Sequence, residues 1–332
     1  MKVLVTGGAG RVGRATVMRL TGSGHEVTMC GRSEKTDAYG ARYVRCDITD
    51  VDSLLPLART VDAIVHLAAI PGPAEAAPEE IFRVNCAGTF AVYEAAARAG
   101  VRRVINASSI NAVGFNFGSR AFPIPYLPVD EQIPGFSTDA YSFSKQITEK
   151  IADYGWRRDG TSSVSLRMPW VAPAALSSRE IVTVHVEKCR ASLKALMALS
   201  ESERRARTEE WIAHLGRYRS ERRAEAEGGG IPYDPPDPLM YGRTDFWTRI
   251  DERDSAQAIE KSLTAGVEGS HVLFVNDSHN ITGVPSLILA SLLFPEAEPR
   301  RVKLDGTNTL VSIDAARRLI GFEPEFSVAR WF

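Results

Sequence analysis

The stretch MKVLVTGGAGRVG, residues 1–13, decides how the rest of the chain is interpreted. Residues 2–6 are a short apolar run rich in β-branched side chains, which is typical of a buried parallel strand. Gly7, Gly10 and Gly13 follow at once, and residues 14–20 have a helical pattern. The glycines allow a tight turn and a close backbone approach, and the first N–H groups of a helix attract an anion. This stretch therefore predicts a binding site for a pyrophosphate.

The composition is that of an ordinary globular protein. The chain has 332 residues, 44% hydrophobic and 24% charged, so it can bury a large core in one or two domains. A net charge of -1 gives no reason to expect a nucleic-acid or membrane partner. No apolar run approaches the ~20 residues of a membrane span, and the first residues enter a strand directly, so we expect no signal peptide.

The four cysteines, Cys30, Cys46, Cys86 and Cys189, are scattered and form no C-x-x-C motif. This spacing argues against a zinc site and against a disulfide framework, and no metal is expected elsewhere. We expect buried free thiols and a cytoplasmic location.

Strands and helices alternate in the first half. Apolar runs predict strands over residues 26–30, 43–46, 63–68, 103–107 and 164–167, and the alanine-rich residues 78–100 and residues 139–156 predict helices. This alternation predicts an α/β fold with a doubly wound parallel sheet of about seven strands, whose carboxyl edge binds the ligands. The proline-rich residues 114–138 are expected to form an extended loop over that edge.

The second half is less regular. Residues 178–230 are rich in arginine and glutamate, with apolar residues at helical spacing, which favours a solvated helical pair over a lid or a subunit contact. A loop over residues 228–238 follows, then helices near 250–265, 285–294 and 314–320 and a strand at 272–275. We divide the chain into a nucleotide-binding domain, residues 1–175, and a mainly substrate-binding portion, residues 176–332, which carries the helical insertion and returns some segments to the first domain.

Tyr141 and Lys145 are the strongest candidates for chemistry. Four positions apart, they share one helix face, and an ammonium beside a phenol is expected to lower the tyrosine pKa below its reference of ~10. The pair would then exchange protons near neutral pH. The alternative is an ordinary exposed helical pair. Ser108 and Ser109 follow a predicted strand at the ligand edge, where a hydroxyl either polarises a substrate carbonyl or caps a turn.

Taken together, these motifs resemble the extended short-chain dehydrogenase/reductase family, which includes NAD(P)-dependent sugar epimerases and dehydratases. The resemblance rests on motifs in the family's order: TGGAGRVG at 6–13, CDITD at 46–50, HLAAI at 66–70, VNCAGT at 84–89, NASSINAVG at 106–114, YSFSK at 141–145 and LRMPWVAP at 166–173. A weaker match to a family motif, RIDERDSAQA, lies at 249–258. The resemblance implies a Rossmann-like fold.

The resemblance also implies roles for individual residues. It implies that Ser109, Tyr141 and Lys145 are the catalytic residues, with Ser109 preferred to Ser108 as the catalytic hydroxyl. Lys145 would also hold the nicotinamide ribose. The residues implied in cofactor binding are Gly7, Gly10, Arg11, Val12, Gly13, Arg32, Ser33, Asp47, Ile48, Leu67, Ala68, Ala69, Asn85, Tyr141, Lys145, Pro169 and Val171.

The sequence departs from the family pattern after the second predicted strand. NAD-specific members carry an aspartate there that holds the ribose hydroxyls, whereas this chain has Cys30-Gly31-Arg32-Ser33. Arg32 could pair with a 2′-phosphate; an exposed turn arginine without that role is the alternative. We therefore expect NADP in preference to NAD.

Two further departures concern the reaction. Ile110-Asn111 replace the acidic pair that family dehydratases carry after the catalytic hydroxyl, which disfavours a 4,6-dehydratase. Trp170 replaces the asparagine that helps many members to bind a nucleotide-sugar diphosphate. His66 is interpreted as a packed structural histidine, and Asn276-Asp277-Ser278 either line the substrate pocket or form a turn.

The sequence thus predicts an NAD(P)-dependent oxidoreductase that transfers a hydride at a hydroxyl or carbonyl carbon of a sugar-like or small carbonyl substrate. A nucleotide-sugar epimerase with tightly bound NAD is the main alternative, and a non-catalytic dinucleotide-binding regulator is a minor one. Because family members often pair through the long helices, we expect a homodimer.

Overall fold

A computed structural model describes residues 1–34, 38–224, 234–299 and 304–332. Its centre is a seven-stranded sheet in the order β10-β7-β5-β4-β1-β2-β3, and all neighbouring strands are parallel. The strands are β1 (Lys2–Thr6), β2 (Glu26–Gly31), β3 (Arg42–Arg45), β4 (Ala63–His66), β5 (Arg103–Ser109), β7 (Ser162–Met168) and β10 (Ser270–Phe274). The predicted doubly wound parallel sheet is confirmed.

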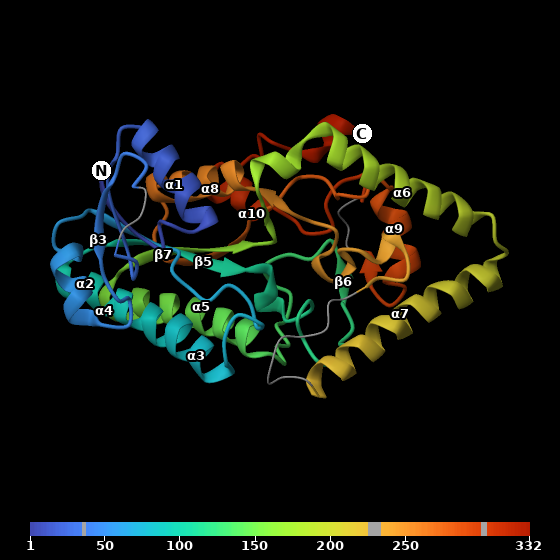
Figure 1. Cartoon of the computed structure of the whole chain (residues 1–332), viewed down its shortest axis with the longest axis horizontal. Coiled ribbons are helices and arrows are strands. Elements are labelled where there is room, and N and C mark those ends of the chain that lie inside the picture. Colours follow the sequence, from blue (N-terminus) through green and yellow to red (C-terminus); the bar gives the residue numbers. More distant parts are fainter. Residues whose placement is uncertain (35–37, 225–233, 300–303) are drawn as a thin grey trace.

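Helices cover both faces of this sheet (Figure 1). One face carries α1 (Arg11–Gly22), α8 (Glu252–Thr264) and α10 (Asp314–Ile320); the other carries α2 (Val51–Ala58), α3 (Pro78–Phe82), α4 (Gly88–Ala99) and α5 (Ala140–Asp159). Side chains alternate along β1, so Val3 and Val5 join the core under α1 and α8, whereas Leu4 joins the core under α2 and α4. The strand is therefore apolar on both sides, as a doubly covered parallel strand requires.

The predicted helix at 78–100 is interrupted. Between α3 and α4 the backbone makes a π-helical turn over Arg83–Ala87, and the helix ends at Gly100 with φ 76°. A π turn inserts one residue into the helix and changes which side chains face the sheet edge. This turn contains Asn85.

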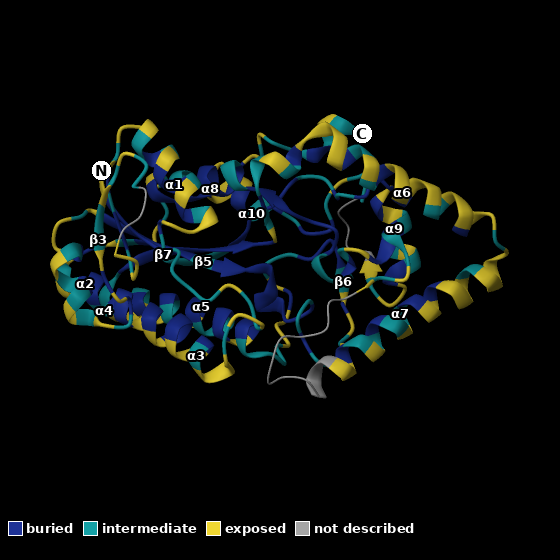
Figure 2. Cartoon of the chain, viewed as in Figure 1, coloured by how far each residue is buried: buried dark blue, intermediate teal, exposed yellow. Residues whose placement is uncertain are grey.

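A second hydrophobic core lies beyond the carboxyl edge of the sheet. It is built from α6 (Arg179–Met197), α7 (Glu201–Ala224), α9 (Ser286–Leu293) and the long segment between β5 and α5. Figure 2 shows the α6–α7 hairpin exposed along its outer side. Its inner side supplies Cys189, Leu196, Trp211 and Leu215 to this core. The predicted helical pair is present. Its outer side is exposed to solvent, and its inner side packs into the second core.

Two pairs of short strands lie outside the large sheet, one at each core. In the predicted loop at 114–138, β6 (Tyr126–Leu127) pairs with β11 (Glu298–Pro299). β8 (Val171–Ala172), just after the last sheet motif, pairs with β9 (Ile250–Asp251). Of the predicted loop at 228–238, residues 228–233 lie outside the described residues. Among the described helices, none is both long and apolar enough to cross a membrane.

Candidate active site

One large cavity runs along the carboxyl edge of the sheet, between the two cores. Its volume is about 1250 Å³, which exceeds the ~300–1,000 Å³ of a usual small-molecule pocket. Its walls come from the turns after β1, β2, β4, β5 and β7, and from α5, α6 and residues 241–249. The cavity therefore has room for a dinucleotide and a second, smaller molecule.

The glycine turn forms the floor of this cavity. Gly7 has φ +70°, and a Cβ there would lie 2.6 Å from the backbone nitrogen of Ala68. A Cβ on Gly13 would lie 2.2 Å from the carbonyl oxygen of Gly7. Gly10 begins α1 and offers no side-chain cap, so the first N–H groups of the helix are left for another acceptor. This cradle fits the pyrophosphate of a dinucleotide.

The far end of the same cavity is lined by Arg32, Ser33, Asp47 and Ile48. The Asp47 carboxylate accepts hydrogen bonds from the backbone N–H and the hydroxyl of Thr49, both at 2.9 Å. The Thr49 backbone bond is the main cause that lowers the pKa of Asp47, with a smaller contribution from Arg32. Arg32 thus brings positive charge to the end of the cavity where the resemblance implies the adenosine part of the cofactor.

Three candidate catalytic residues meet at the middle of the cavity. The Asp139 side chain caps α5 by accepting from the Ser142 N–H at 2.8 Å, and Tyr141 and Lys145 follow on one face of the helix. A hydrogen bond joins the side chains of Ser109 and Tyr141. The Lys145 Nζ donates to the Ala107 carbonyl at 2.8 Å and lies 5.7 Å from the centre of the Tyr141 ring.

The expected fall in the Tyr141 pKa is wrong for this structure. Burial raises the pKa of the phenol to about 12, and the hydrogen bond from Ser109 opposes this only in part. Burial also lowers the pKa of Lys145 to about 8. The cost of removing both groups from water outweighs their mutual attraction, because the ammonium points at Ala107 rather than at the phenol oxygen.

The two serines after β5 are not equivalent. The Ser108 hydroxyl donates to Glu149 at 2.6 Å, and Arg167 holds the same carboxylate through two bonds of 2.8 Å. Ser108 is therefore committed to a buried ion pair. The Ser109 hydroxyl accepts from the Asn111 N–H at 3.1 Å and contacts Tyr141, so it is the serine available to a substrate.

Asn85 is the one predicted cofactor residue that does not line the cavity. Its amide accepts from the Ile70 N–H at 2.7 Å and donates to the Ile70 carbonyl and to Ser144. Asn85 thus holds the cavity wall at Ile70 from behind, while its neighbour Val84 lines the cavity. All other predicted site residues line it.

Neither His66 nor the Asn276–Ser278 segment lines the cavity. His66 is buried between Thr6 at 2.8 Å and Thr89 at 3.0 Å, and burial lowers its pKa to about 3, so it is a packed neutral histidine. The Asn276–Ser278 segment does not line the cavity; the Asp277 carboxylate instead accepts from Ser327 and from the Val328 N–H, both at 2.7 Å. Among the described residues, no cluster of three or more His, Cys, Asp or Glu side chains could hold a metal ion.

The substrate end of the cavity contains residues that the sequence did not single out. They are His185 on α6 and Tyr241, Asp245 and Thr248. Arg249 joins them and belongs to the weak motif at 249–258; its guanidinium reaches the Leu176 carbonyl at 3.4 Å. Their positions depend on contacts between distant segments, so sequence spacing offered no direct signal.

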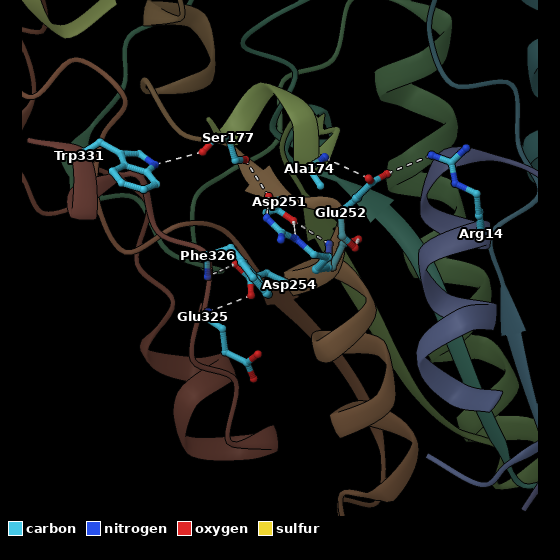
Figure 3. A network of polar contacts seen from close by, with 11 residues as sticks. Arg14, Ala174, Ser177, Asp251, Glu252, Asp254, Glu325, Phe326 and Trp331 are labelled. Carbon is cyan, nitrogen blue, oxygen red and sulfur yellow. Dashed lines mark hydrogen bonds and ion pairs between the residues drawn. The ribbon is translucent and has the colours of Figure 1, made fainter. Parts of the chain in front are cut away.

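A polar network at the start of α8 fixes this end of the molecule (Figure 3). Asp251 accepts from the Ser177 hydroxyl at 2.7 Å, and Glu252 accepts from the Ala174 N–H and from Arg14 of α1. Asp254 accepts from the N–H groups of Glu325 and Phe326, and Trp331 donates to the Ser177 carbonyl at 3.0 Å. The network fastens residues 174–177 and 325–331 to β9 and the start of α8, next to cavity residues Leu176 and Val328.

The chain was compared with known proteins. Residues 3–205 match the model of the NAD dependent epimerase/dehydratase family. An L-arabinose 1-dehydrogenase (NAD(P)(+)) of Haloferax volcanii is 35% identical over 179 residues, 52% of this chain and 68% of that protein. A uronate dehydrogenase of Pseudomonas putida is 32% identical over 184 residues, 55% of this chain and 65% of that protein. The matches thus span about two thirds of each relative.

Among solved structures, a short-chain dehydrogenase/reductase superfamily protein from Agrobacterium tumefaciens with bound NAD superposes with a TM-score of 0.64. It is 23% identical, and the alignment covers 100% of this chain and 94% of that one. At this identity the likeness concerns the fold alone.

Proposed function

Since this chain belongs to the NAD dependent epimerase/dehydratase family, we propose that it is an NAD(P)-dependent oxidoreductase acting on a hydroxyl or carbonyl carbon of a sugar-like or small carbonyl substrate. One observation carries the proposal: Ser109, Tyr141 and Lys145 line the same cavity as the glycine cradle. The names of the two relatives, an L-arabinose 1-dehydrogenase and a uronate dehydrogenase, support a sugar substrate.

The residues divide the work as follows. In the oxidation direction, Tyr141 removes the proton from the substrate hydroxyl, and Ser109 orients the same oxygen by a hydrogen bond. Lys145 contributes positive charge beside the phenol and donates toward the cofactor ribose. A bound nicotinamide cofactor supplies the acceptor for the hydride.

The test is direct. Purified protein is incubated with NAD⁺ or NADP⁺ and a panel of aldoses and uronic acids, and reduced nicotinamide is followed by absorbance. We expect turnover with at least one sugar. The proposal would be refuted if the protein oxidised none of the sugars with NAD⁺ or NADP⁺ and reduced none of a set of small carbonyl compounds with NADH or NADPH.

A nucleotide-sugar epimerase is the second candidate, favoured by the size of the cavity, about 1250 Å³. An epimerase keeps its cofactor throughout the cycle. The amount of nicotinamide that co-purifies distinguishes the two: a stoichiometric amount of bound NAD, together with conversion of a UDP-sugar to its epimer, would favour the epimerase.

We propose NADP as the preferred cofactor. Gly31 stands where a carboxylate would repel a 2′-phosphate, and Arg32 lines the same end of the cavity. A hydrogen bond to a charged group contributes about 1.5–3 kcal/mol. Arg32→Ala is therefore expected to weaken NADP roughly 10- to 100-fold in a fluorescence titration and to leave NAD nearly unchanged. Equal losses for both cofactors would remove the argument.

We also propose a homodimer. Four aromatic side chains are exposed on α3, α4 and α5 and stack in two pairs, Phe82 with Phe143 at 6.0 Å and Phe90 with Tyr154 at 6.2 Å. Large aromatic side chains left exposed in pairs on neighbouring helices are typical of an interface. Light scattering of the protein and of a Phe90→Glu/Phe143→Glu variant tests this: the variant is expected to be monomeric, and a monomeric unmodified chain would refute the dimer.

A cytoplasmic location is proposed on the state of the thiols. All four cysteines are buried and free, which suits a reducing compartment. Fractionation of the native host with an antibody against this chain would check it.

A further inference from the structure

The segment Gly242–Arg249 has an unusual backbone. Gly242, Phe246 and Trp247 all have positive φ, at 81°, 56° and 51°. Two consecutive residues with large side chains rarely adopt this left-handed conformation. Conformations of this kind persist only where the surroundings impose them, and they concentrate at functional sites.

The surroundings do impose it here. Phe246 stacks on Phe115 and Phe294, with ring centres 5.4 and 5.7 Å apart, and it is fully buried. The Trp247 N–H donates to the Gly242 carbonyl at 2.7 Å, and its indole N–H donates to the Leu239 carbonyl at 2.7 Å. Burial of both rings in the second core therefore holds the strained turn in one conformation.

The turn presents Thr244 and Asp245 to the cavity. The Thr244 hydroxyl donates to the Asn116 side chain at 2.6 Å. Phe117, which follows Asn116 in the chain, packs edge to face with the Tyr141 ring, and the two ring centres are 5.8 Å apart. Asp245 therefore belongs to the wall near the reactive end.

The Asp245 carboxylate makes no hydrogen bond or ion pair with any residue that the structure describes. Burial is the cause that raises its pKa, to about 7. Asp245 is half-buried in the cavity wall, and a carboxylate that is partly withdrawn from water without a partner is costly. Thr248, one turn further on, also has a buried hydroxyl without a partner among the described residues.

Arg249 is another charged group at this end. Burial lowers its pKa, and the nearby carboxylates of Asp277 and Asp251 oppose this only in part. Its guanidinium donates to the Leu176 carbonyl, and its Nη2 has no partner among the described residues. Burial and Arg249 both lower the pKa of His185, which keeps this imidazole neutral. Asp245 is therefore the carboxylate of this end that has no partner among the described residues, and it offers a hydrogen-bond acceptor with negative character.

We propose that Asp245 is a specificity-determining residue that binds hydroxyl groups of an uncharged polyhydroxylated substrate, a free sugar. This inference rests on the proposed oxidoreductase function. A carboxylate accepts from two neighbouring hydroxyls at once and repels phosphate or carboxylate groups. Thr248 offers a further hydrogen-bond partner beside it.

The experiment compares the full-length protein with Asp245→Asn and Asp245→Ala on free aldoses, on their singly deoxygenated analogues and on a UDP-sugar. We expect Asp245→Asn to raise KM for the best aldose about 10- to 100-fold, with cofactor affinity unchanged within about twofold. The deoxy analogue that lacks the bound hydroxyl should be poor for the unmodified enzyme and should lose nothing further in the variant. Asp52→Asn, an exposed carboxylate in the first turn of α2, is the matched control.

The outcomes separate the two claims. Turnover of aldoses with KM unchanged by Asp245→Asn would overturn this inference and leave the oxidoreductase intact. A UDP-sugar or an amino sugar as the preferred substrate would overturn the uncharged class. No turnover of any sugar would refute the proposed function and this inference with it. Melting temperature and cofactor titration show that each variant is folded.

Discussion

The two ends of the cavity are built in opposite ways. The cofactor end comes from turns that directly follow strands of one sheet, so each residue is placed by its neighbours in sequence. The substrate end comes from α6, the 241–249 turn and Val328, which meet only because the second core forms. The comparison teaches that the reaction type is encoded locally, whereas substrate choice is encoded in tertiary contacts.

Tyr141→Phe should have the largest effect and should separate chemistry from binding. Removal of the phenol hydroxyl is expected to reduce kcat by about 10²–10⁴-fold, the usual contribution of a positioned acid or base. Cofactor affinity should stay within about twofold, because the ring remains. Tyr154→Phe, on the same helix but 38% exposed, is the control. Retained activity would rule out Tyr141 as the acid or base.

The serine pair offers the next sharpest contrast. Ser109→Ala is expected to reduce kcat by about 10²-fold, as the loss of an oxyanion donor does. Ser108→Ala removes one bond to the Glu149 carboxylate and should cost about 1.5–3 kcal/mol of stability, with kcat within about threefold. Steady-state kinetics and thermal unfolding measure both. The reverse pattern would show that Ser108 is the reacting hydroxyl.

Gly13→Ala tests the cofactor end alone. Its Cβ would lie 2.2 Å from the Gly7 carbonyl oxygen, so the turn must open, at a cost of about 1–3 kcal/mol. Cofactor affinity is expected to fall roughly 10- to 100-fold, in line with that free energy. Gly22→Ala, at the end of the same helix, meets nothing within 4 Å and should leave affinity unchanged. Equal effects of both variants would contradict the cradle.

The smallest expected effect is a pH-dependent change of stability at the substrate end. The pKa of Asp245 in the folded protein, about 7, is above the ordinary value of 3.8 for an aspartate, so ionisation destabilises the folded protein as pH rises between these values. Asp245→Asn should match the unmodified protein near pH 4. Above pH 7 it should melt roughly 2–4 °C higher, or about 1 kcal/mol in a chain of this size. A constant difference at all pH values would contradict the raised pKa.

The sheet, the glycine cradle and the Ser109–Tyr141–Lys145 group could be predicted from sequence because each depends on local order: a strand, a turn that needs glycine, and a helix spacing. Asn85 was expected at the cavity, but the π-helical turn over Arg83–Ala87 directs it to Ile70. The Tyr141 pKa could not be predicted because it depends on burial.

Asp245 could not be predicted for a related reason. Its position follows from positive φ values at Phe246 and Trp247, residues that give no sign of such a turn. It also depends on the contact between Thr244 and Asn116, which are 128 positions apart. Contacts of this kind form only when the second core packs, and no hydrophobic periodicity or motif spacing in the sequence indicates them.

The network in Figure 3 also has a consequence for synthesis on the ribosome. Residues 325–331 emerge after every strand of the large sheet, yet they bind Asp254 and Ser177 and bring Val328 into the cavity wall. A nascent chain can therefore assemble the sheet and the glycine cradle while its substrate end still lacks one wall. We expect this end of the cavity to be completed only when residues 325–331 have left the ribosome.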